Sequence, residues 1–373
     1  MPFADELLGR EAAATLVDVL ATVAPERDLA AVRAAADALD GLALRERSDL
    51  LRDALLTTFP DSYRDLATVA RAAHAHTDAF AGWLIWPVTS AVAVRAVDDG
   101  SPQVFDDAMD VLAVLTGRLT SEFAIRTLLL RDWERAMGIV QGWVSSQDHH
   151  VRRLASEGTR PFLPWGVRVP QLMVQPEATL PVLDALYRDE SDYVRTSVAN
   201  HLNDLSRNNP DLVVSTVRRW LADPAPTTDA VVRRALRTLV KRGDPAALDV
   251  LGFSTSATIE ISGPVVGAAH VAIGESLPFA GHVKNIGTEP ANVLVDYVVY
   301  HHKANGTQTS KTFKLTSRTL APGEVLQLSR SHSLKLITTR RYHPGPHAIA
   351  LQVNGVATEP VPFMLLPAGE TTL

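Results

Sequence analysis

The hydrophobic and polar positions of this chain follow two different periods. Up to about residue 250, apolar residues recur at the three- and four-residue spacing that places them on one face of an α-helix. Beyond it, apolar and β-branched residues alternate in short runs, separated by turn sequences such as Asn305-Gly306 and Pro322-Gly323. The pattern predicts an α-helical first part and a β-stranded second part.

Helical spacing is found at residues 7–23, 29–42, 44–58, 68–78, 88–98, 103–115, 121–131, 133–145, 148–158, 182–189, 192–207, 210–221 and 229–242. Four polar residues at the start of such segments are expected to cap helices with their side-chain oxygens: Ser121, Asp148, Asp192 and Asp229. Strands are predicted at residues 257–262, 277–285, 292–302, 311–319, 324–333 and 347–353. About seven or eight strands in roughly 120 residues are typical of an immunoglobulin-like sandwich.

The helical part contains a repeat. Val151, Val194 and Val232 each precede an arginine in similar segments, spaced 43 and 38 residues apart. This is the period of HEAT-type helical pairs, which stack into a curved solenoid. The arginines of these segments are expected on its concave face, where they would bind a polyanion. They are Arg152, Arg153, Arg195, Arg233, Arg234 and Arg237. An equally open alternative is that each arginine pairs with a neighbouring aspartate and has a structural role.

Length and composition set the domain organisation. A chain of 373 residues exceeds what one hydrophobic core usually covers, so we expect a multidomain protein: an all-α HEAT-like solenoid followed by an all-β immunoglobulin-like sandwich. We place these domains at residues 1–250 and 251–373, with the linker at 244–256. The absence of cysteine excludes disulfides, thiolate metal sites and cysteine nucleophiles. No apolar run approaches the roughly 20 residues that span a bilayer, and no signal-peptide pattern is present, so we expect a cytoplasmic protein without a membrane partner.

Charge is unevenly distributed along the chain. The total is −6, but residues 1–117 carry −10 and residues 118–242 carry +4. Within the basic region, Glu122, Glu157 and Asp204 are 35 and 47 residues apart, about one repeat, so stacked repeats would bring them to one surface. Carboxylates among arginines repel a polyanion, and this arrangement favours a site that stabilises a positive charge formed during a reaction.

Three function classes fit this chain. The carboxylates favour an enzyme that acts on nucleic acid, and Trp165, in a loop between Pro164 and Gly166, suits stacking on a base or a ribose. The alternative is a non-catalytic HEAT-repeat DNA-binding or protein-scaffold module, which gives no reason for acids among arginines. A protein adaptor that docks through the acidic residues 1–117 is the third.

Two further expectations concern ionisation and metal binding. Gly158 is expected to end the helix that carries Glu157, and the negative end of the helix dipole is expected to raise the pKa of Glu157. His149, His150 and His201 do not have the spacing of a recognisable ligand set, so we expect no metal and no other cofactor.

Two longer segments resemble a known family. They are VRRLASEGTRPFLPW at residues 151–165 and SVANHLND at residues 197–204, and GWLIWP at residues 82–87 adds to the match. In order and spacing they are similar to the AlkC branch of the AlkC/AlkD-type bacterial DNA glycosylases. Some members of that branch also carry a C-terminal immunoglobulin-like domain, as expected here.

The resemblance implies a monomeric glycosylase that hydrolyses the N-glycosidic bond of cationic N-alkylated bases in duplex DNA, notably 3-methyladenine and 3-methylcytosine, without base flipping. It assigns carboxylates to catalysis, where they stabilise an oxocarbenium-like deoxyribose and position water; we expect Glu157 to be the essential acid, then Asp204, then Glu122. It places Trp165 beside the sugar and adds Arg160 to the DNA-binding residues. The expected location is the bacterial cytoplasm, in association with the nucleoid.

One position departs from the family pattern. The family often has arginine where this chain has Phe162. Because an aromatic ring cannot neutralise a phosphate, the resemblance implies a weaker phosphate contact at this position.

Overall fold

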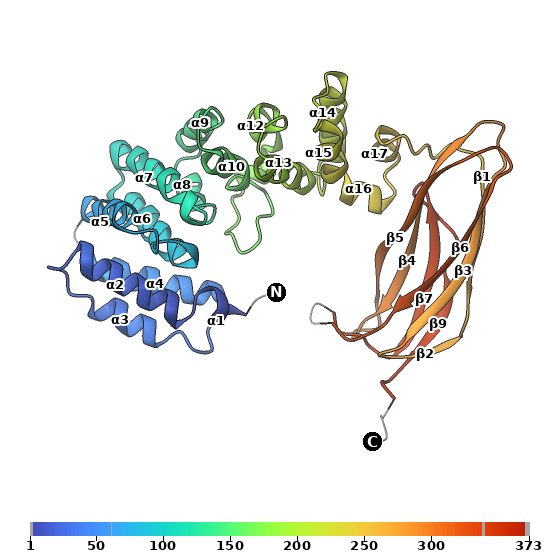
Figure 1. Ribbon diagram of the computed structural model, residues 1–373, viewed down its shortest axis with the longest axis horizontal. Helices are drawn as coiled ribbons and strands as arrows, with labels where there is room; N and C mark the ends of the chain where they lie inside the picture. The colour runs from blue at the N-terminus through green and yellow to red at the C-terminus, as the bar shows by residue number, and fades with distance from the viewer. Residues whose placement is uncertain (1–2, 61, 338–339, 370–373) are drawn as a thin grey trace. The chain divides into compact units, whose positions relative to one another are not determined.

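The computed structural model describes residues 3–60, 62–337 and 340–369 of the chain. They form two compact units: one consists of the described residues up to Val213 together with Trp220–Ala235, and the other of Val214–Arg219 together with the described residues from Leu236 onward. Helices build the first unit, and a β-sandwich with two short helices builds the main part of the second (Figure 1). The predicted order, an all-α part followed by an all-β sandwich, is confirmed. None of the helices in the described part of the chain combines the length and the apolar character that a membrane crossing requires.

The α-helices are, in chain order, α1 Ala4–Leu7, α2 Arg10–Val23, α3 Ala30–Asp37, α4 Leu44–Thr58, α5 Tyr63–His76, α6 Ile85–Asp99, α7 Pro102–Leu115, α8 Ile125–Arg131, α9 Trp133–Trp143, α10 His149–Glu157, α11 Gln171–Val174, α12 Leu180–Leu186, α13 Asp192–Leu205, α14 Pro210–Ala222, α15 Thr228–Ala235, α16 Arg237–Arg242 and α17 Pro245–Val250. Three 3-10 turns are η1 Gly82–Leu84, η2 Thr116–Arg118 and η3 Pro176–Thr179. Most helices lie close to their predicted bounds, and α4 has the predicted ones.

The predicted helix caps are only partly correct. Asp148 caps α10 as expected, because its carboxylate accepts the backbone N–H of His150 at 2.8 Å. Ser121 is not a cap: its hydroxyl donates to the carbonyl of residue 112, and α8 begins only at residue 125. Asp192 and Asp229 lie inside the first turns of α13 and α15 rather than before them. Polar residues in the first turn resemble caps in sequence, since both positions favour the same side chains.

The helix predicted at residues 229–242 is two helices. Leu236, with ψ of −2°, interrupts the helical ladder between α15 and α16. Gly243, with φ of +76°, ends α16, and Asp244 then caps α17 by accepting the backbone N–H of Ala247 at 2.9 Å. The predicted linker therefore contains a short helix. Both α16 and α17 belong to the second compact unit, and a functional domain boundary at residue 250 stays a prediction.

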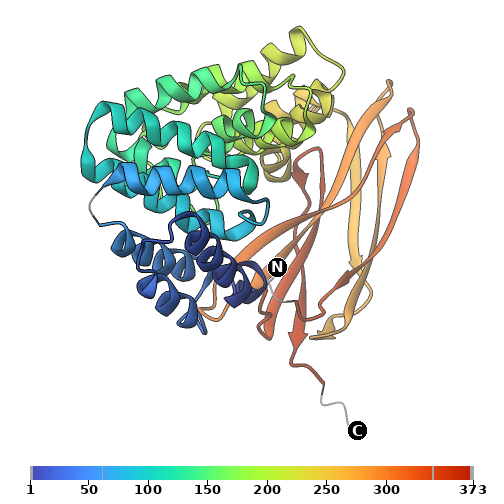
Figure 2. The ribbon, with the colours of Figure 1, turned by 60° about the vertical axis from the view of Figure 1, so that its left-hand side comes forward.

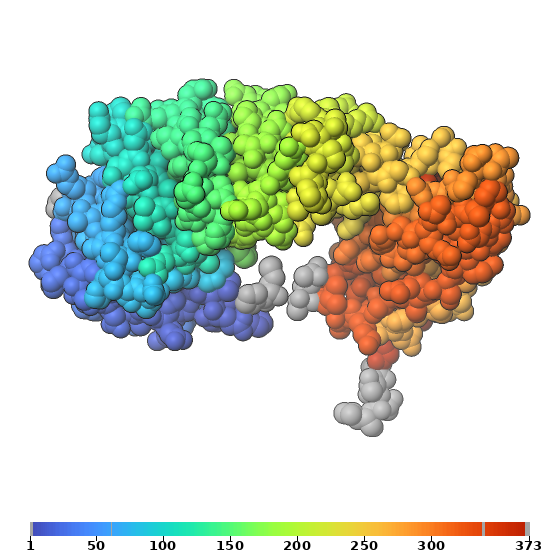
Figure 3. Space-filling model, turned by 45° about the horizontal axis from the view of Figure 1, so that its top comes forward, coloured from blue at the N-terminus to red at the C-terminus, as the bar shows by residue number. Residues whose placement is uncertain are grey.

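The repeat in the helical unit has a physical basis. α10 packs against α13 and α13 against α15, and the valines that these helices carry at equivalent positions, Val151, Val194 and Val232, are buried. Consecutive helices form neighbouring bands from blue to yellow-green in the space-filling view (Figure 3). This stacking of equivalent helices brings residues one repeat apart onto one surface.

The sandwich consists of two sheets, seen side by side in Figure 2. Its strands are β1 Ile259–Val266, β2 His270–Ala272, β3 Ser276–Asn285, β4 Ala291–His302, β5 Gln308–Leu320, β6 Val325–Ser333, β7 Gly345–Val353, β8 Val356–Ala357 and β9 Val361–Leu366. One sheet has the order β1-β3-β6 and the other the order β2-β9-β7-β4-β5, with β8 paired to β7. The prediction missed β2, β8 and β9. β2 and β8 have only three and two residues, too few to show an alternation. β9 has six residues, but its exposed positions Pro362, Met364 and Leu366 are apolar, so its sequence does not alternate.

Three histidines are buried in the sandwich. His301 on β4, His332 on β6 and His347 on β7 are at most 7% exposed. Burial, followed by the positive charge of Arg340, lowers the pKa of His301 to about 3 and that of His332 to about 4, and burial also lowers the pKa of His347. Burial has the opposite effect on an acid and raises the pKa of Asp296 to about 6.

These groups predict how the stability of the sandwich depends on pH. The buried histidines contribute stability that is complete above the unfolded pKa of about 6.5 and is lost as the pH falls toward about 3 to 4. Asp296 contributes in the opposite sense, with stability gained as the pH falls through about 6. We expect the melting temperature of the sandwich, measured by calorimetry, to fall between pH 7 and pH 5. Asp296→Asn should steepen that fall and His332→Gln should flatten it. Three identical pH profiles would contradict this prediction.

Candidate carboxylate site

Three carboxylates and two guanidinium groups form one continuous chain of ion pairs. Arg153 on α10 contacts Glu122, which precedes α8, and lies 3.5 Å from Glu157 at the end of α10. Arg160, in the loop after α10, lies 2.6 Å from Glu157 and 2.9 Å from Asp204 on α13. The structure thus brings together the three acids that the repeat spacing placed on one surface, together with two of the predicted DNA-binding arginines. We call these five residues the carboxylate site.

The carboxylate site is withdrawn from solvent. The exposed fraction of its side chains ranges from 3% for Asp204 to 14% for Arg153. Charges removed from water are tolerated only when opposite charges contact them, because desolvation costs several kcal/mol per ion. Three carboxylates share two guanidinium groups, so the site carries one negative charge in excess when all five groups are ionised.

Burial is the largest influence on both glutamates, yet their pKa values move in opposite directions. Burial and the charge of Glu157 raise the pKa of Glu122, against the attraction of Arg153. Burial acts on Glu157 in the same sense, but Arg153, Arg160 and a hydrogen bond from Ser197 outweigh it and lower the pKa of Glu157. The predicted increase is therefore wrong, although Glu157 does end α10: two arginines outweigh the helix dipole. Glu157 is ionised at neutral pH.

Neutral hydrogen-bond donors hold the glutamates in place. The Ser197 hydroxyl donates to Oε2 of Glu157 at 2.6 Å, and the Thr120 hydroxyl donates to Oε2 of Glu122 at 2.8 Å. Nearby, Nδ1 of His201 donates to a backbone carbonyl of α10 at 2.8 Å. Burial lowers the pKa of His201 to about 4, so this residue supports the site without adding charge at neutral pH.

One buried arginine fastens the loop after α10, the green excursion below α10 and α13 in Figure 1. Arg126 of α8 is fully buried, and its guanidinium donates to the carbonyls of Gly158 at 3.0 Å, Arg160 at 2.9 Å and Val167. Burial lowers its pKa to about 10, so Arg126 is still charged at neutral pH. Both ends of the segment that carries Trp165 are thereby tied to α8.

Trp165 begins a row of aromatic side chains. It is 45% exposed and has φ of +59°, a strained conformation for a residue other than glycine. Its ring meets that of Trp83 edge-on at 5.8 Å, Trp83 lies 6.1 Å from Trp86, and Trp86 stacks on Phe123 at 4.1 Å. A cavity of about 60 Å³ is lined in part by Trp86, Phe123 and Trp165. The row leads from the exposed loop to the residue after Glu122.

Two of the predicted DNA-binding arginines have structural partners. Nε of Arg152 lies 2.6 Å from Asp189, and its Nη1 donates to the carbonyls five and six residues before it. Arg195, one repeat later, donates to the carbonyls at the same two offsets, at 2.8 and 2.5 Å. Arg195 also lies 3.3 Å from Asp192, so both arginines pair with a neighbouring aspartate, as the structural alternative expects. DNA binding by Arg152 and Arg195 stays a prediction.

The other predicted arginines lie in different surroundings. Arg153 and Arg160 belong to the carboxylate site. Arg233 and Arg234 are exposed on α15, where Arg234 contacts the Thr196 hydroxyl of α13. Arg237 is half-buried on α16, in the second compact unit. Their binding to DNA also stays a prediction.

A group of possible metal ligands lies at the start of α10. Among the described residues, ligand atoms of Asp148, His149 and His150 lie within 4.8 Å of one another. Asp148 and His149 are exposed, and the Asp148 carboxylate already accepts the N–H that it caps. The expectation that the chain needs no metal is untested and stays a prediction.

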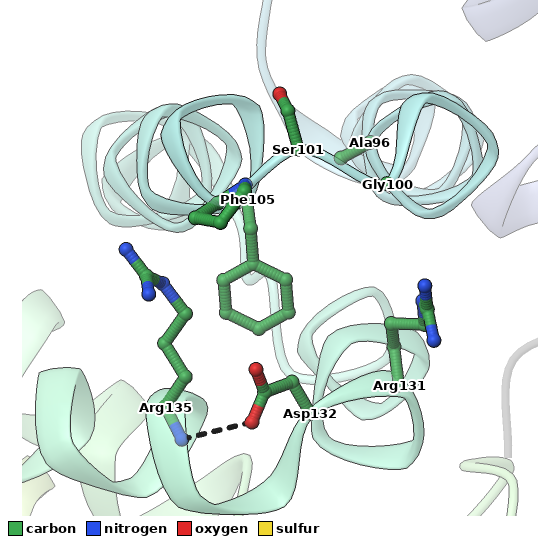
Figure 4. A pocket seen from close by; sticks show the side chains of 8 residues that line it. Ala96, Gly100, Ser101, Phe105, Arg131, Asp132 and Arg135 are labelled. Carbon is green, nitrogen blue, oxygen red and sulfur yellow. Dashed lines mark hydrogen bonds between the residues drawn. The ribbon is translucent and has the colours of Figure 1, made fainter.

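A pocket of about 120 Å³ lies elsewhere in the helical unit (Figure 4). Phe105, Arg131, Asp132 and Arg135 contribute to its lining. The backbone N–H of Arg135 donates to the Asp132 carboxylate at 3.1 Å, and the Arg135 side chain pairs with Asp106 at 2.5 Å. These charges serve helix capping and helix packing, and the pocket contains none of the predicted site residues.

Comparisons with known proteins agree with this architecture. The family model described as "Uncharacterised protein YhaZ, C-terminal Ig-like domain" matches residues 260–367. "Uncharacterized protein YhaZ" of Bacillus subtilis (strain 168) is 33% identical over 324 residues, which are 87% of this chain and 88% of that protein. The structure of Pseudomonas fluorescens alkylpurine DNA glycosylase AlkC, bound to DNA containing an abasic site analog, is 31% identical with a TM-score of 0.87, and the match covers 98% of this chain and 100% of that one. The chain belongs to the AlkC family. The recognised branch and the immunoglobulin-like character of the sandwich are confirmed.

Three residues that support the carboxylate site were not selected as site residues from the sequence. Ser197 and Thr120 orient the glutamates, and Arg126 fastens the loop. The sequence did contain one indication of Ser197. It lies 43 residues after Leu154, which is buried, so one repeat has a polar residue at a position where the preceding repeat has a buried leucine. Arg126 gave no such signal, because its partners are backbone carbonyls, which are independent of the side chains in the loop.

The close packing of the loop on Arg126 predicts a strict requirement for glycine at residue 166. A Cβ on Gly166 would lie 2.9 Å from Cδ2 of Leu163 and 3.1 Å from Cδ of Arg126. We expect Gly166→Ala to lower the free energy of unfolding by about 1–3 kcal/mol and to accelerate amide exchange in residues 158–167. Gly138→Ala on α9 is the matched control, since a Cβ there meets no atom within 4 Å, and it should be neutral or stabilise by up to about 1 kcal/mol. Equal effects of the two substitutions would contradict the prediction.

Proposed function

We propose that this protein is a DNA glycosylase that hydrolyses the N-glycosidic bond of cationic N-alkylated bases in duplex DNA, notably 3-methyladenine and 3-methylcytosine, without base flipping. Its similarity over nearly the whole chain to a DNA-bound alkylpurine glycosylase supports the reaction class. The observation that carries the proposal is the excess carboxylate of the buried site, where Glu122, Glu157 and Asp204 share two arginines.

The chemistry requires a negative charge near the sugar. When the bond between C1′ and the base nitrogen breaks, its electron pair leaves with the alkylated base. The base departs neutral, so no acid has to protonate it, and positive charge develops on the deoxyribose. A carboxylate at 4 Å stabilises such a charge by about 4 kcal/mol at an effective dielectric constant of 20.

The three acids are suited to different roles. Glu157 is held ionised by Arg153 and Arg160, and we assign it to the charge on the sugar. Asp204 positions the water and takes its proton as the oxygen bonds to C1′, which leaves an abasic site. Glu122 adds negative charge to the same site. None of these steps uses a cofactor.

Trp165 supplies the apolar contact in this proposal. Its ring is half exposed and backed edge-on by Trp83, so it can lie beside the deoxyribose while Arg126 fixes the loop that carries it. The protein acts as a monomer on duplex DNA in this proposal, at the nucleoid of a bacterial cytoplasm.

Base release tests the reaction and its central residue together. Wild type should release free 3-methyladenine and 3-methylcytosine from methylated duplex DNA, measured by chromatography. Glu157→Gln should slow release by about 100-fold or more, because it removes one preorganised charge from the site. Asp204→Asn and Glu122→Gln should have smaller effects, in that order.

Asp189→Asn is the matched control for these variants. Asp189 is a buried carboxylate that pairs with Arg152 away from the site, so its loss should affect stability and leave release unchanged. Release by Glu157→Gln at the wild-type rate would transfer the central role to Asp204 or Glu122. DNA binding by the wild type without release of any base would support the scaffold alternative.

The opposite pKa shifts of the glutamates predict a specific pH profile. The pKa of Glu157 is lowered, so Glu157 should not titrate between pH 5 and pH 8. The pKa of Glu122 is raised, so the rate of base release should fall as acidification protonates Glu122. In Glu122→Gln the remaining rate should be independent of pH over that acidic range. An acidic decline that persists in this variant would assign the ionisation to another group.

A further inference from the structure

Two exposed arginines beside the carboxylate site share one aromatic ring. The guanidinium carbon of Arg168 lies 5.0 Å from the ring centroid of Phe162, and that of Arg207 lies 4.4 Å from it. Phe162 and Arg168 belong to the loop after α10, whereas Arg207 follows α13. Two separate segments therefore deliver positive charges to one place.

These two charges lack the neutralisation that the neighbouring arginines have. Arg152, Arg153 and Arg160 each pair with a carboxylate. Arg168 donates to the carbonyl of residue 161 at 2.9 Å, and within the described ranges neither Arg168 nor Arg207 has a carboxylate partner. The charge of Arg168 acts on Arg126 as well, where it follows burial as a cause of the lowered pKa.

The geometry keeps the two guanidinium groups close. Distances of 5.0 and 4.4 Å to the same centroid place their carbons at most 9.4 Å apart. A pair of uncompensated cations at this separation creates a local positive potential that an anion completes. Guanidinium groups match the oxygens of a phosphate, because they present several N–H donors in one plane.

The position of the pair links it to the carboxylate site. Phe162 is two residues after Arg160, and Arg207 is three residues after Asp204. Since Arg160 and Asp204 pair at 2.9 Å, the two arginines flank this end of the site. A nucleic-acid strand whose sugar lies at the carboxylates has its phosphates next to that sugar.

We infer that Arg168 and Arg207, held on Phe162, bind the phosphodiester backbone of the DNA strand that carries the target nucleotide. The inference rests on the proposed function, because it requires DNA at the carboxylate site. Phe162 is a positioning residue here: its ring orients two arginines. Arg168 and Arg207 thereby supply the phosphate contact that an arginine at position 162 would otherwise make.

The dependence of DNA affinity on salt tests this inference. Affinity falls as salt rises, and each phosphate contact makes the slope of log affinity against log salt steeper by about 0.9. Arg168→Gln combined with Arg207→Gln should therefore reduce the magnitude of this slope by about 1.8. Affinity for an undamaged duplex oligonucleotide is measured across a salt series by fluorescence anisotropy. Arg33→Gln combined with Arg64→Gln removes the same charge from exposed positions of α3 and α5, and it should leave the slope close to that of the wild type.

Phe162→Leu separates orientation from charge. It retains both arginines and removes the ring that holds them, so affinity should fall several-fold while the salt slope stays near the wild-type value. A general loss of structure would not give this combination, and melting curves establish that each variant is folded. If the double variant is unstable, the two single variants should each lower the slope by about 0.9.

Each outcome decides between the two proposals. Equal slopes for the Arg168 and Arg207 double variant and its control overturn the phosphate site, whether or not the protein releases bases. A lower slope in a protein that releases no methylated base overturns the proposed glycosylase and leaves the phosphate site standing. A wild-type protein that binds no duplex overturns both.

Discussion

Carboxylates can be buried in a protein only if positive groups contact them, and this constraint organises the helical unit around its candidate site. Glu122, Glu157 and Asp204 come from three successive parts of the repeat array. Arg153 and Arg160 lie between them, and each bridges two acids. The array supplies the spacing, and the arginines supply the charge that makes burial tolerable. Removing Arg153 would take from Glu122 the cation that contacts it, and removing Arg160 would do the same to Asp204.

The position of Arg160 depends in turn on a second buried arginine. Arg160 lies in a loop rather than on a helix, and a loop alone would not fix a side chain between Glu157 and Asp204. Arg126 fixes the loop through three backbone carbonyls, and the small Gly166 allows it to approach closely. The same contacts hold Trp165 at a positive φ. Strain of this kind persists only where surrounding contacts determine the backbone, and it is typical of functional sites.

The sequence predicted what depends on periodicity and missed what depends on tertiary contacts. The helical period, the strand alternation and the 43- and 38-residue repeat predicted the order of the two folds, and the repeat placed the three acids together. The predicted increase in the pKa of Glu157 was wrong. The helix end that suggested it can be read from the sequence, whereas Arg160 and Ser197, which help to lower this pKa, contact Glu157 only in the folded protein. Asp148 caps its helix and Asp192 does not, although both precede similar segments. Asp148 lies one residue before its helix begins, whereas Asp192 is the first residue of its helix. The hydrophobic pattern does not locate a helix end to within one residue.

The arginines of the basic region illustrate why charge counts alone do not locate a binding surface. Positive charge there is partly consumed inside the protein: Arg152 pairs with Asp189, and Arg153 and Arg160 pair with the site acids. What attracts a polyanion is the charge left uncompensated at the surface. Two such charges meet on Phe162, at the end of the site where Arg160 and Asp204 pair. The proposed function, which combines a phosphate contact with the stabilisation of a cation on the neighbouring sugar, requires both signs of charge side by side. Here the carboxylates lie in the buried site, in contact with Arg153 and Arg160, whereas Arg168 and Arg207 lie exposed beside it. The two signs of charge are therefore close together but do not pair with each other.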